Sequence, residues 1–262
     1  RSTLFPYTTL FRSRKMSGHN KWSTIKHAKG AADAKRGALF TKLIKEISIA
    51  ASMGGGDQNS NPRLRAAIVK ARAASMPKDN IERAIKKGTG ELGGGTFEEL
   101  VYEGYAAGGV AVLVEVLTDN HNRAAANVRN IFTKTGGNLG TSGSVSRMFD
   151  RKGVIEYDAE KVSEDEVMEA AIEAGAEDVV TEDGVITVTT APNDFTTVVE
   201  ALEPKGWEAL SAEVSMVPQA YTAVDKDTAA KVDKLIGRLE EDDDVQNVWT
   251  TIEYPDDYEP EE

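Results

Sequence analysis

The spacing of apolar residues changes near residue 93. Before that point, apolar residues between Phe40 and Ile47 recur at i, i+3, i+4 and i+7, which predicts one buried helical stripe. After it, the apolar runs 101–106 and 110–118 follow a period of two and are separated by Ala-Gly-Gly, which is typical of a β-hairpin. The pattern therefore predicts a helical N-terminal part followed by mixed α and β structure.

Capping and breaking residues divide the first part into four predicted helices. Ser23 can cap the first helix, which is predicted to end at Gly37. The second helix follows directly and carries the apolar stripe. Asn61-Pro62 predicts the start of a third helix, with asparagine as cap and proline in the first turn. Pro77 breaks that helix and opens a short fourth one.

The order of strands and helices in the second part predicts two α+β units. Residues 151–218 read β-α-β-β-α-β, which is the order of a ferredoxin-like unit. The segments on either side can complete a second unit, so the ferredoxin-like unit is predicted to be an insertion. We expect a multidomain α+β protein, with an N-terminal helical bundle followed by two α+β (ferredoxin-like) domains, one inserted in the other. The predicted boundaries are 1–15 for a non-native leader, 16–92 for the basic helical domain, 93–150 plus 219–253 for the discontinuous α+β domain, 151–218 for the inserted domain and 254–262 for an acidic tail.

The two ends of the chain differ from the rest. The opening "RSTLFPYTTLFRSRK" repeats Thr-Leu-Phe and lacks the continuous apolar core of a secretory signal, so we interpret it as a non-native leader before a natural start at Met16. The final residues, 254–262, are rich in acids and are predicted to be disordered. No run approaches about 18 apolar residues, so no membrane partner is expected. The absence of cysteine fits a reducing compartment, and we expect a cytoplasmic protein.

The net charge of -12 is unevenly distributed. Residues 16–90 hold 15 Lys and Arg against 5 acids, whereas residues 91–262 hold 12 against 38. A basic segment on an acidic body points to a polyanionic partner for that segment. The alternative is a set of solvated helix faces that only keep the protein soluble.

The basic N-terminal residues are candidate phosphate contacts, because Lys and Arg neutralise phosphates and release counterions whatever the base sequence. Trp22 can either stack on an unpaired base or anchor the N-terminal arm on the bundle. No helix-turn-helix signature stands out. The predicted nucleic-acid-binding residues are Lys21, Trp22, Lys26, His27, Lys29, Lys35, Arg36, Lys42, Lys45, Arg63, Arg65, Lys70, Arg72, Lys86 and Lys87.

Catalysis is the weaker hypothesis. The best enzyme candidate is the loop Asp119–Arg123 at a strand end, but Asp119 or Asn120 is better explained as the cap of a helix that begins at Asn122. The only histidines are His19, His27 and His121, and their spacing matches neither a catalytic triad nor a zinc site. We therefore predict no catalytic residue, no metal ligand and no cofactor.

Two further segments are explained without chemistry. The glycines of 136–144 could cradle a phosphate, but they lack a Walker pattern and a dinucleotide fingerprint, so a mobile connecting loop is the better prediction. The acidic run 240–244 could attract a cation, but such a run is usually a solvated helix end.

Four blocks of the chain together resemble the YebC/PmpR family. The blocks are "GHNKWSTIKHAKGAADAKRGALFTKLIKEISIAA", "NPRLRAAIVKARAASMPKDNIERAIKKGTG", "YEGYAAGGVAVLVEVLTDNHNRAAANVR" and "GGNLGTSGSVSRMF". The resemblance runs from Met16 to about Ile252 without large gaps, and its combined specificity is high. The chain departs from the family in its leader and in a longer acidic tail, neither of which touches the matching blocks.

The resemblance implies a helical domain followed by two α+β domains in a cytoplasmic bacterial protein. It implies a DNA-binding transcriptional regulator, although the mitochondrial relative activates translation of a cytochrome oxidase subunit and other members act on ribosomes stalled at proline-rich sequences. Our main prediction is therefore a nucleic-acid-binding regulator of gene expression acting on duplex DNA. The alternatives are a translation factor that binds ribosomal RNA and the ribosome, and an enzyme that uses the Asp119–Arg123 loop.

Overall fold

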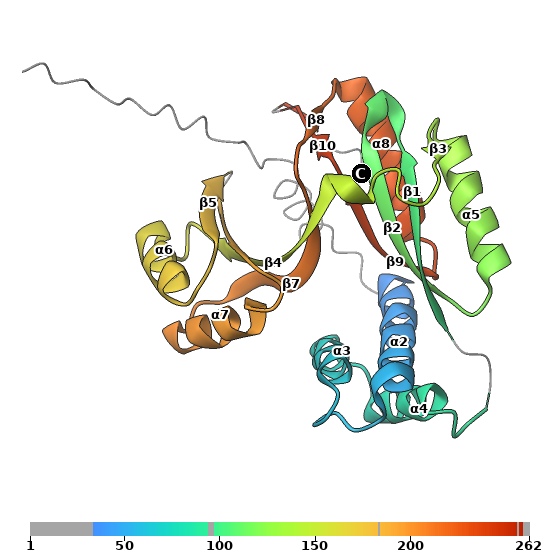
Figure 1. The fold of residues 1–262 in the computed structure, drawn as a ribbon, viewed down its shortest axis with the longest axis horizontal. Helices are drawn as coiled ribbons and strands as arrows, with labels where there is room; N and C mark the ends of the chain where they lie inside the picture. Colours follow the sequence, from blue (N-terminus) through green and yellow to red (C-terminus); the bar gives the residue numbers. More distant parts are fainter. Residues whose placement is uncertain (1–33, 94–96, 183, 256, 259–262) are drawn as a thin grey trace, which may run out of the picture. The chain divides into compact units, whose positions relative to one another are not determined.

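The computed structural model describes residues 34–93, 97–182, 184–255, 257 and 258 of the chain (Figure 1). These residues form two compact units. One unit is Gly153–Glu213, and the other contains the described residues up to Lys152 and from Val214 onward. N-terminal helices are followed by antiparallel sheets, so the mixed α and β architecture is confirmed. The domain boundaries given above remain predictions.

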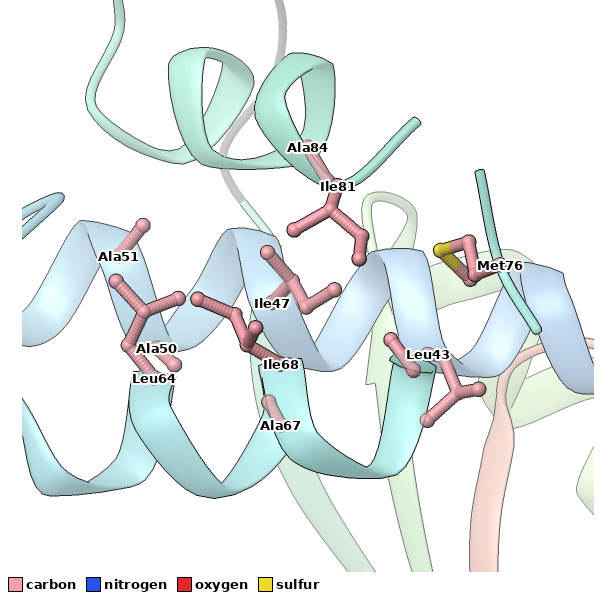
Figure 2. Close-up of a cluster of buried hydrophobic side chains, with 11 residues drawn as sticks. Leu43, Ile47, Ala50, Ala51, Leu64, Ala67, Ile68, Met76, Ile81 and Ala84 are labelled. Carbon is pink, nitrogen blue, oxygen red and sulfur yellow. The ribbon is translucent and has the colours of Figure 1, made fainter. Parts of the chain in front are cut away.

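Three helices open the larger unit: α2 (Ala34–Gly54), α3 (Pro62–Ala73) and α4 (Lys78–Gly88). Both α3 and α4 pack on α2 (Figure 1). Figure 2 shows apolar side chains of the three helices, among them Ile47, Ile68 and Ile81, pointing toward one another in a shared core. The side chain of Asn61 accepts a hydrogen bond from the Leu64 backbone N–H, so the predicted N-cap of α3 is confirmed.

The predicted helix end at Gly37 is wrong, because α2 runs through this residue without interruption. A glycine inside a helix costs about 1 kcal/mol relative to alanine. The good helix formers on both sides and the buried stripe that begins at Leu43 offset that cost. Gly88, by contrast, has a packing role, since a Cβ placed there would lie 2.1 Å from the carbonyl oxygen of Ser48.

The rest of the larger unit contains a four-stranded antiparallel sheet in the order β3-β1-β2-β9 and a two-stranded parallel sheet of β8 and β10. The hairpin predicted from the alternating runs is confirmed, with Glu98 opposite Thr118 at one end and Tyr105 opposite Ala111 at the other. The helices α5 and α8 contact each other and the sheet. The elements are β1 (Glu98–Tyr105), η1 (Ala107–Gly109), β2 (Ala111–Thr118), α5 (His121–Lys134), β3 (Asn138–Leu139), η2 (Ser146–Met148), β8 (Thr222–Ala223), α8 (Lys226–Glu240), β9 (Val245–Thr250) and β10 (Ile252–Glu253).

The smaller unit has the predicted β-α-β-β-α-β order, and its sheet order β5-β6-β4-β7 is that of a ferredoxin-like unit. Its core contains Ile155 and Val188 from the strands together with Val167 of α6 and Leu202 of α7. The elements are β4 (Phe149–Asp158), α6 (Glu164–Glu173), β5 (Asp178–Glu182), β6 (Val185–Thr190), α7 (Phe195–Leu202), η3 (Glu203–Lys205) and β7 (Ala209–Pro218).

The prediction of a disordered tail is wrong at its beginning. Tyr254 and Tyr258 are buried, and their rings stack at a centroid distance of 5.3 Å. Both hydroxyl groups donate to the carboxylate of Asp233 on α8. Burial and the Asp233 charge raise the pKa of Tyr254. The acid-rich composition of the tail gives no sign of this tyrosine pair. The two rings pack together, and their hydroxyl groups share Asp233 as a polar partner.

Candidate nucleic-acid interface

The predicted basic residues fall into three groups in the structure. Five of them, which are Lys21, Trp22, Lys26, His27 and Lys29, lie outside the described residues. Lys35 and Arg36 belong to the first turn of α2, and their side chains lie outside the described part of the structure. The remaining eight can be placed individually.

Lys42 and Lys45 of α2 are used inside the protein. The Lys45 ammonium group lies 2.6 Å from Asp244 Oδ1 and also donates to the carbonyl oxygen of Asp243 at 2.6 Å. Lys42 donates to the carbonyl oxygen of Glu240 at 2.8 Å. These lysines therefore tie α2 to the end of α8 and to the turn after it, so we leave both out of the proposed phosphate-binding surface.

Asp244 is the centre of this network. The sequence pattern did not identify it, because it predicts that the acidic run 240–244 is a solvated helix end. Its side chain is 5% exposed and accepts from Lys45, from Arg123 Nη2 at 2.8 Å and from the Thr118 hydroxyl group at 3.1 Å. Burial alone would raise the pKa of Asp244. The hydrogen bonds from Lys45 and Arg123 outweigh burial and hold the pKa below its ordinary value of 3.8.

Arg63 of α3 forms a second internal bridge. Its guanidinium group lies 2.8 Å from Glu46 on α2 and 2.9 Å from Glu99 on β1. The hydrogen bond to Glu46 raises the pKa of Arg63. Several carboxylates lie close together here. Burial and the charges of Glu99 and Glu46 raise the pKa of the adjacent Glu115. Arg63 therefore holds two elements together through acids, and we leave it out of the surface as well.

Arg65 is exposed but has a local structural role. Its guanidinium group donates to the carbonyl oxygens of Gln58 and Asn59, at 3.0 and 2.7 Å. These contacts fix the loop between α2 and α3. A guanidinium has five N–H donors, so the group can still meet a phosphate while it holds the loop.

Helices α3 and α4 carry exposed positive charge, most of it near their C-terminal ends. Lys70 and Arg72 lie in the last turn of α3, and Lys86 lies in the last turn of α4. Arg83, which was not among the predicted residues, is also exposed on α4. Arg72, Arg83 and Lys86 form no salt bridge with any residue that the structure describes. We call these three residues the α3–α4 cation set.

The pairing on α4 differs from the pairing that the sequence suggests. The spacings predict local support from Asp79–Arg83 and Glu82–Lys86. In the structure Glu82 instead lies 3.3 Å from Lys78, one turn earlier. Arg83 and Lys86 are left without a carboxylate among the described residues, which is why both belong to the cation set.

Lys87 lies at the end of α4, with its ammonium group 4.5 Å from the ring centre of Phe97. A cation over an aromatic face is stabilised by the ring quadrupole. Both residues line a cleft of about 600 Å³ together with Asp119, Arg123 and residues 241–244. Five carboxylates line this cleft, so it repels phosphate more than it attracts it.

The Asp119–Arg123 loop has a structural explanation. Asn120 is the N-cap of α5 and accepts from the Arg123 backbone N–H, which confirms the predicted capping role; the helix begins at His121 rather than Asn122. Arg123 lies 3.0 Å from Asp119 and 2.8 Å from Asp244. The geometry therefore places Asp119 in the ion-pair network around Asp244.

The glycine-rich segment 136–144 is held in place by an internal anion. The buried carboxylate of Glu103 on β1 accepts from the backbone N–H groups of Gly143 and Val145 at 2.7 Å and of Ser146 at 2.8 Å. The hydroxyl group of Tyr105 donates to the carbonyl oxygen of Ser144. These hydrogen bonds fix the segment, so the prediction of a mobile loop is wrong. The backbone donors that could cradle a phosphate are already bound to Glu103.

Replacing Glu103 with glutamine is expected to destabilise the protein by about 2–4 kcal/mol, since the amide group must face backbone N–H donors in a buried site. Burial alone would raise the pKa of Glu103, but the three backbone donors outweigh it and lower the pKa. The difference in unfolding free energy between the parent and the variant is therefore complete well above the ordinary pKa of 4.5. It shrinks as the pH falls through the lower folded-state pKa. Urea denaturation between pH 3 and 7 measures it.

The matched control is Glu98→Gln on the same strand, because Glu98 is exposed. Hydrogen exchange of the Val145 and Ser146 amides provides a local readout, and exchange should accelerate in the Glu103 variant alone. Equal destabilisation in both variants, or unchanged exchange at Val145, would contradict the role assigned to Glu103.

No group of three or more His, Asp or Glu side chains within the described ranges is arranged to hold a metal ion. No helix in the described part of the chain is long and apolar enough to cross a membrane.

The helical segment with its exposed cation set and the antiparallel α+β segments match known proteins over nearly the whole chain. A family model described as the TACO1/YebC protein N-terminal domain matches residues 20–91, and one described as the TACO1/YebC second and third domain matches residues 97–252. The chain belongs to the TACO1/YebC family.

Individual relatives agree with the family models. A Treponema denticola protein named probable transcriptional regulatory protein is 73% identical over 93% of this chain and 99% of its own length. A protein of the same name from Trichlorobacter lovleyi is 60% identical over 91% of this chain and 96% of its own length. The crystal structure of a conserved hypothetical protein from Aquifex aeolicus is 52% identical, covers 90% of this chain and 98% of that chain, and has a TM-score of 0.82.

Proposed function

We propose that the protein is a regulator of gene expression that binds nucleic acid through its N-terminal helical segment. The observation that carries the proposal is the α3–α4 cation set, three exposed cations without carboxylate partners among the described residues. In a chain of net charge -12, exposed cations of this kind are suited to phosphate groups. The regulatory role is supported by the relatives named probable transcriptional regulatory protein.

The grip that we propose does not depend on base sequence. Arg72 and Lys86 lie in the last turns of α3 and α4, where positive side chains also compensate the helix dipole, and Arg83 lies three residues before Lys86. Arg65 and Lys70 extend the positive surface along α3. Phosphate contacts of this kind position a protein on a nucleic acid, whereas base contacts specify the sequence. The proposal therefore concerns phosphate binding, with duplex DNA as the target.

Crosslinking in cells followed by sequencing of the bound nucleic acid tests the target. The first fifteen residues add four positive charges, so the full chain should be compared with one that begins at Met16. We expect enrichment of promoter DNA with both chains. Enrichment of ribosomal RNA would replace DNA by RNA as the target, and loss of all enrichment when the leader is removed would contradict the proposal.

A further inference from the structure

Helix α6 of the smaller unit exposes an apolar pair. Met168 and Ile172 are 39% and 50% exposed, and their spacing of four residues places them side by side on the helix. The core-facing residues Val167 and Ala171 lie on a different face and are fully buried. The core of this unit is therefore complete without burial of the helix face that carries Met168 and Ile172.

Acidic side chains surround the apolar pair. The helix carries Glu164, Asp165, Glu166, Glu169 and Glu173, all of them exposed, and no basic residue. None of these five carboxylates forms a salt bridge with a residue in the described part of the chain. Acids in the first turn stabilise a helix, but Glu173 lies in the last turn, where the helix dipole disfavours a negative charge. Helix stability alone therefore does not explain the full set.

The acidity extends over the whole unit. Residues 153–213 hold 17 acids against 2 lysines. A surface of this charge repels a sugar-phosphate backbone and attracts a cationic one. An apolar centre within a charged rim is also the usual anatomy of a protein–protein interface. The charge therefore selects a basic protein as the occupant of this helix face.

We propose that the α6 face, formed by Met168 and Ile172 with Asp165 and Glu169 beside them, docks a lysine- and arginine-rich protein segment. An apolar side chain of the partner covers Met168 and Ile172, and its cations meet the carboxylates of the rim. This inference goes beyond the proposed function and rests on separate residues. The acidic rim sets the partner's orientation and its association rate, and the apolar pair supplies the buried contact.

A synthetic helical peptide of lysine and leucine residues serves as the probe with the full chain. We expect it to shift the methyl NMR signals of Met168 and Ile172, and its affinity to fall about tenfold in M168S/I172S, since a lost apolar contact of this size is worth roughly one decade. Neutralising the rim in D165N/E169Q should cause a similar loss and weaken the salt dependence. The matched controls are L210S and E200Q/E203Q, exposed positions of the same unit, which should stay within about twofold of the parent.

A photoreactive residue in place of Met168 then tests the site in cells. A crosslink to a basic protein that disappears in D165N/E169Q supports the proposal. A crosslink to nucleic acid or to a second copy of this chain, no crosslink at all, or peptide affinity that falls equally in the control variants would overturn it. Circular dichroism confirms that each variant is folded, and nucleic-acid binding should be unchanged in all of them, which separates this inference from the proposed function.

Discussion

Replacing Asp244 with alanine is expected to cost about 3–5 kcal/mol of folding stability, because it leaves the buried ammonium group of Lys45 without its carboxylate. The Lys45 side chain is only 10% exposed, so water cannot replace the lost partner fully. Arg123 and Thr118 lose a shared acceptor at the same time. Urea denaturation at pH 7 measures the loss.

Two further variants separate the network from general effects on the turn. Asp243→Ala changes the exposed neighbour, whose backbone carbonyl rather than its side chain accepts from Lys45, and should cost little. The double variant K45M/D244A removes both charges and should recover much of the stability lost in D244A. A D243A variant as unstable as D244A, or no recovery in the double variant, would show that the buried charge is not the cause.

The Asp244 contribution also has a defined pH range. Its folded-state pKa lies below the ordinary value, so its stabilisation is complete above pH 3.8 and decreases as the pH falls through the folded-state pKa. The difference between the parent and D244A should therefore be constant near neutral pH and shrink in acid.

Neutralising the α3–α4 cation set in the triple variant R72Q/R83Q/K86Q is expected to weaken nucleic-acid binding by about 10²-fold at 0.1 M salt. Each phosphate contact contributes roughly 0.7–0.9 to the slope of log affinity against log salt, so three lost contacts lower that slope by about 2–3. Fluorescence anisotropy with duplex DNA and with single-stranded RNA, from 50 to 300 mM salt, gives the affinity and slope together.

The matched control removes three exposed cations from α8, in the variant K231Q/K234Q/R238Q. It changes the net charge by the same amount on a helix that we do not assign to the interface. We expect its affinity and slope to stay close to those of the parent. An equal loss in both triple variants would mean that net charge alone drives the binding.

Local patterns predicted much of the fold. The spacing of Leu43 and Ile47 identified the buried stripe of α2, and Asn61-Pro62 marked the start of α3. The order of elements in 151–218 identified the ferredoxin-like unit. These features depend on residues that are close together in the sequence. Helix propensity, capping residues and apolar periodicity therefore predict them directly.

Contacts between distant residues account for what the sequence missed. Lys45 and Asp244 are 199 residues apart, and nothing near Asp244 distinguishes it from the solvated acids beside it. Glu103 is 40 to 43 residues from the loop positions whose backbone N–H groups donate to it. Residues of one charge type thus divide between internal bridges and an exposed surface, and only the fold decides which residues belong to each.

The helical segment should be the part of the protein that contacts bound nucleic acid. Ultraviolet crosslinking of the purified complex, followed by mass spectrometry of the attached peptides, identifies the contacting segments. We expect the crosslinked peptides to come from residues 16–93, including α3 and α4. Crosslinks confined to residues 153–213 or to α8 would contradict a nucleic-acid grip by the helical segment.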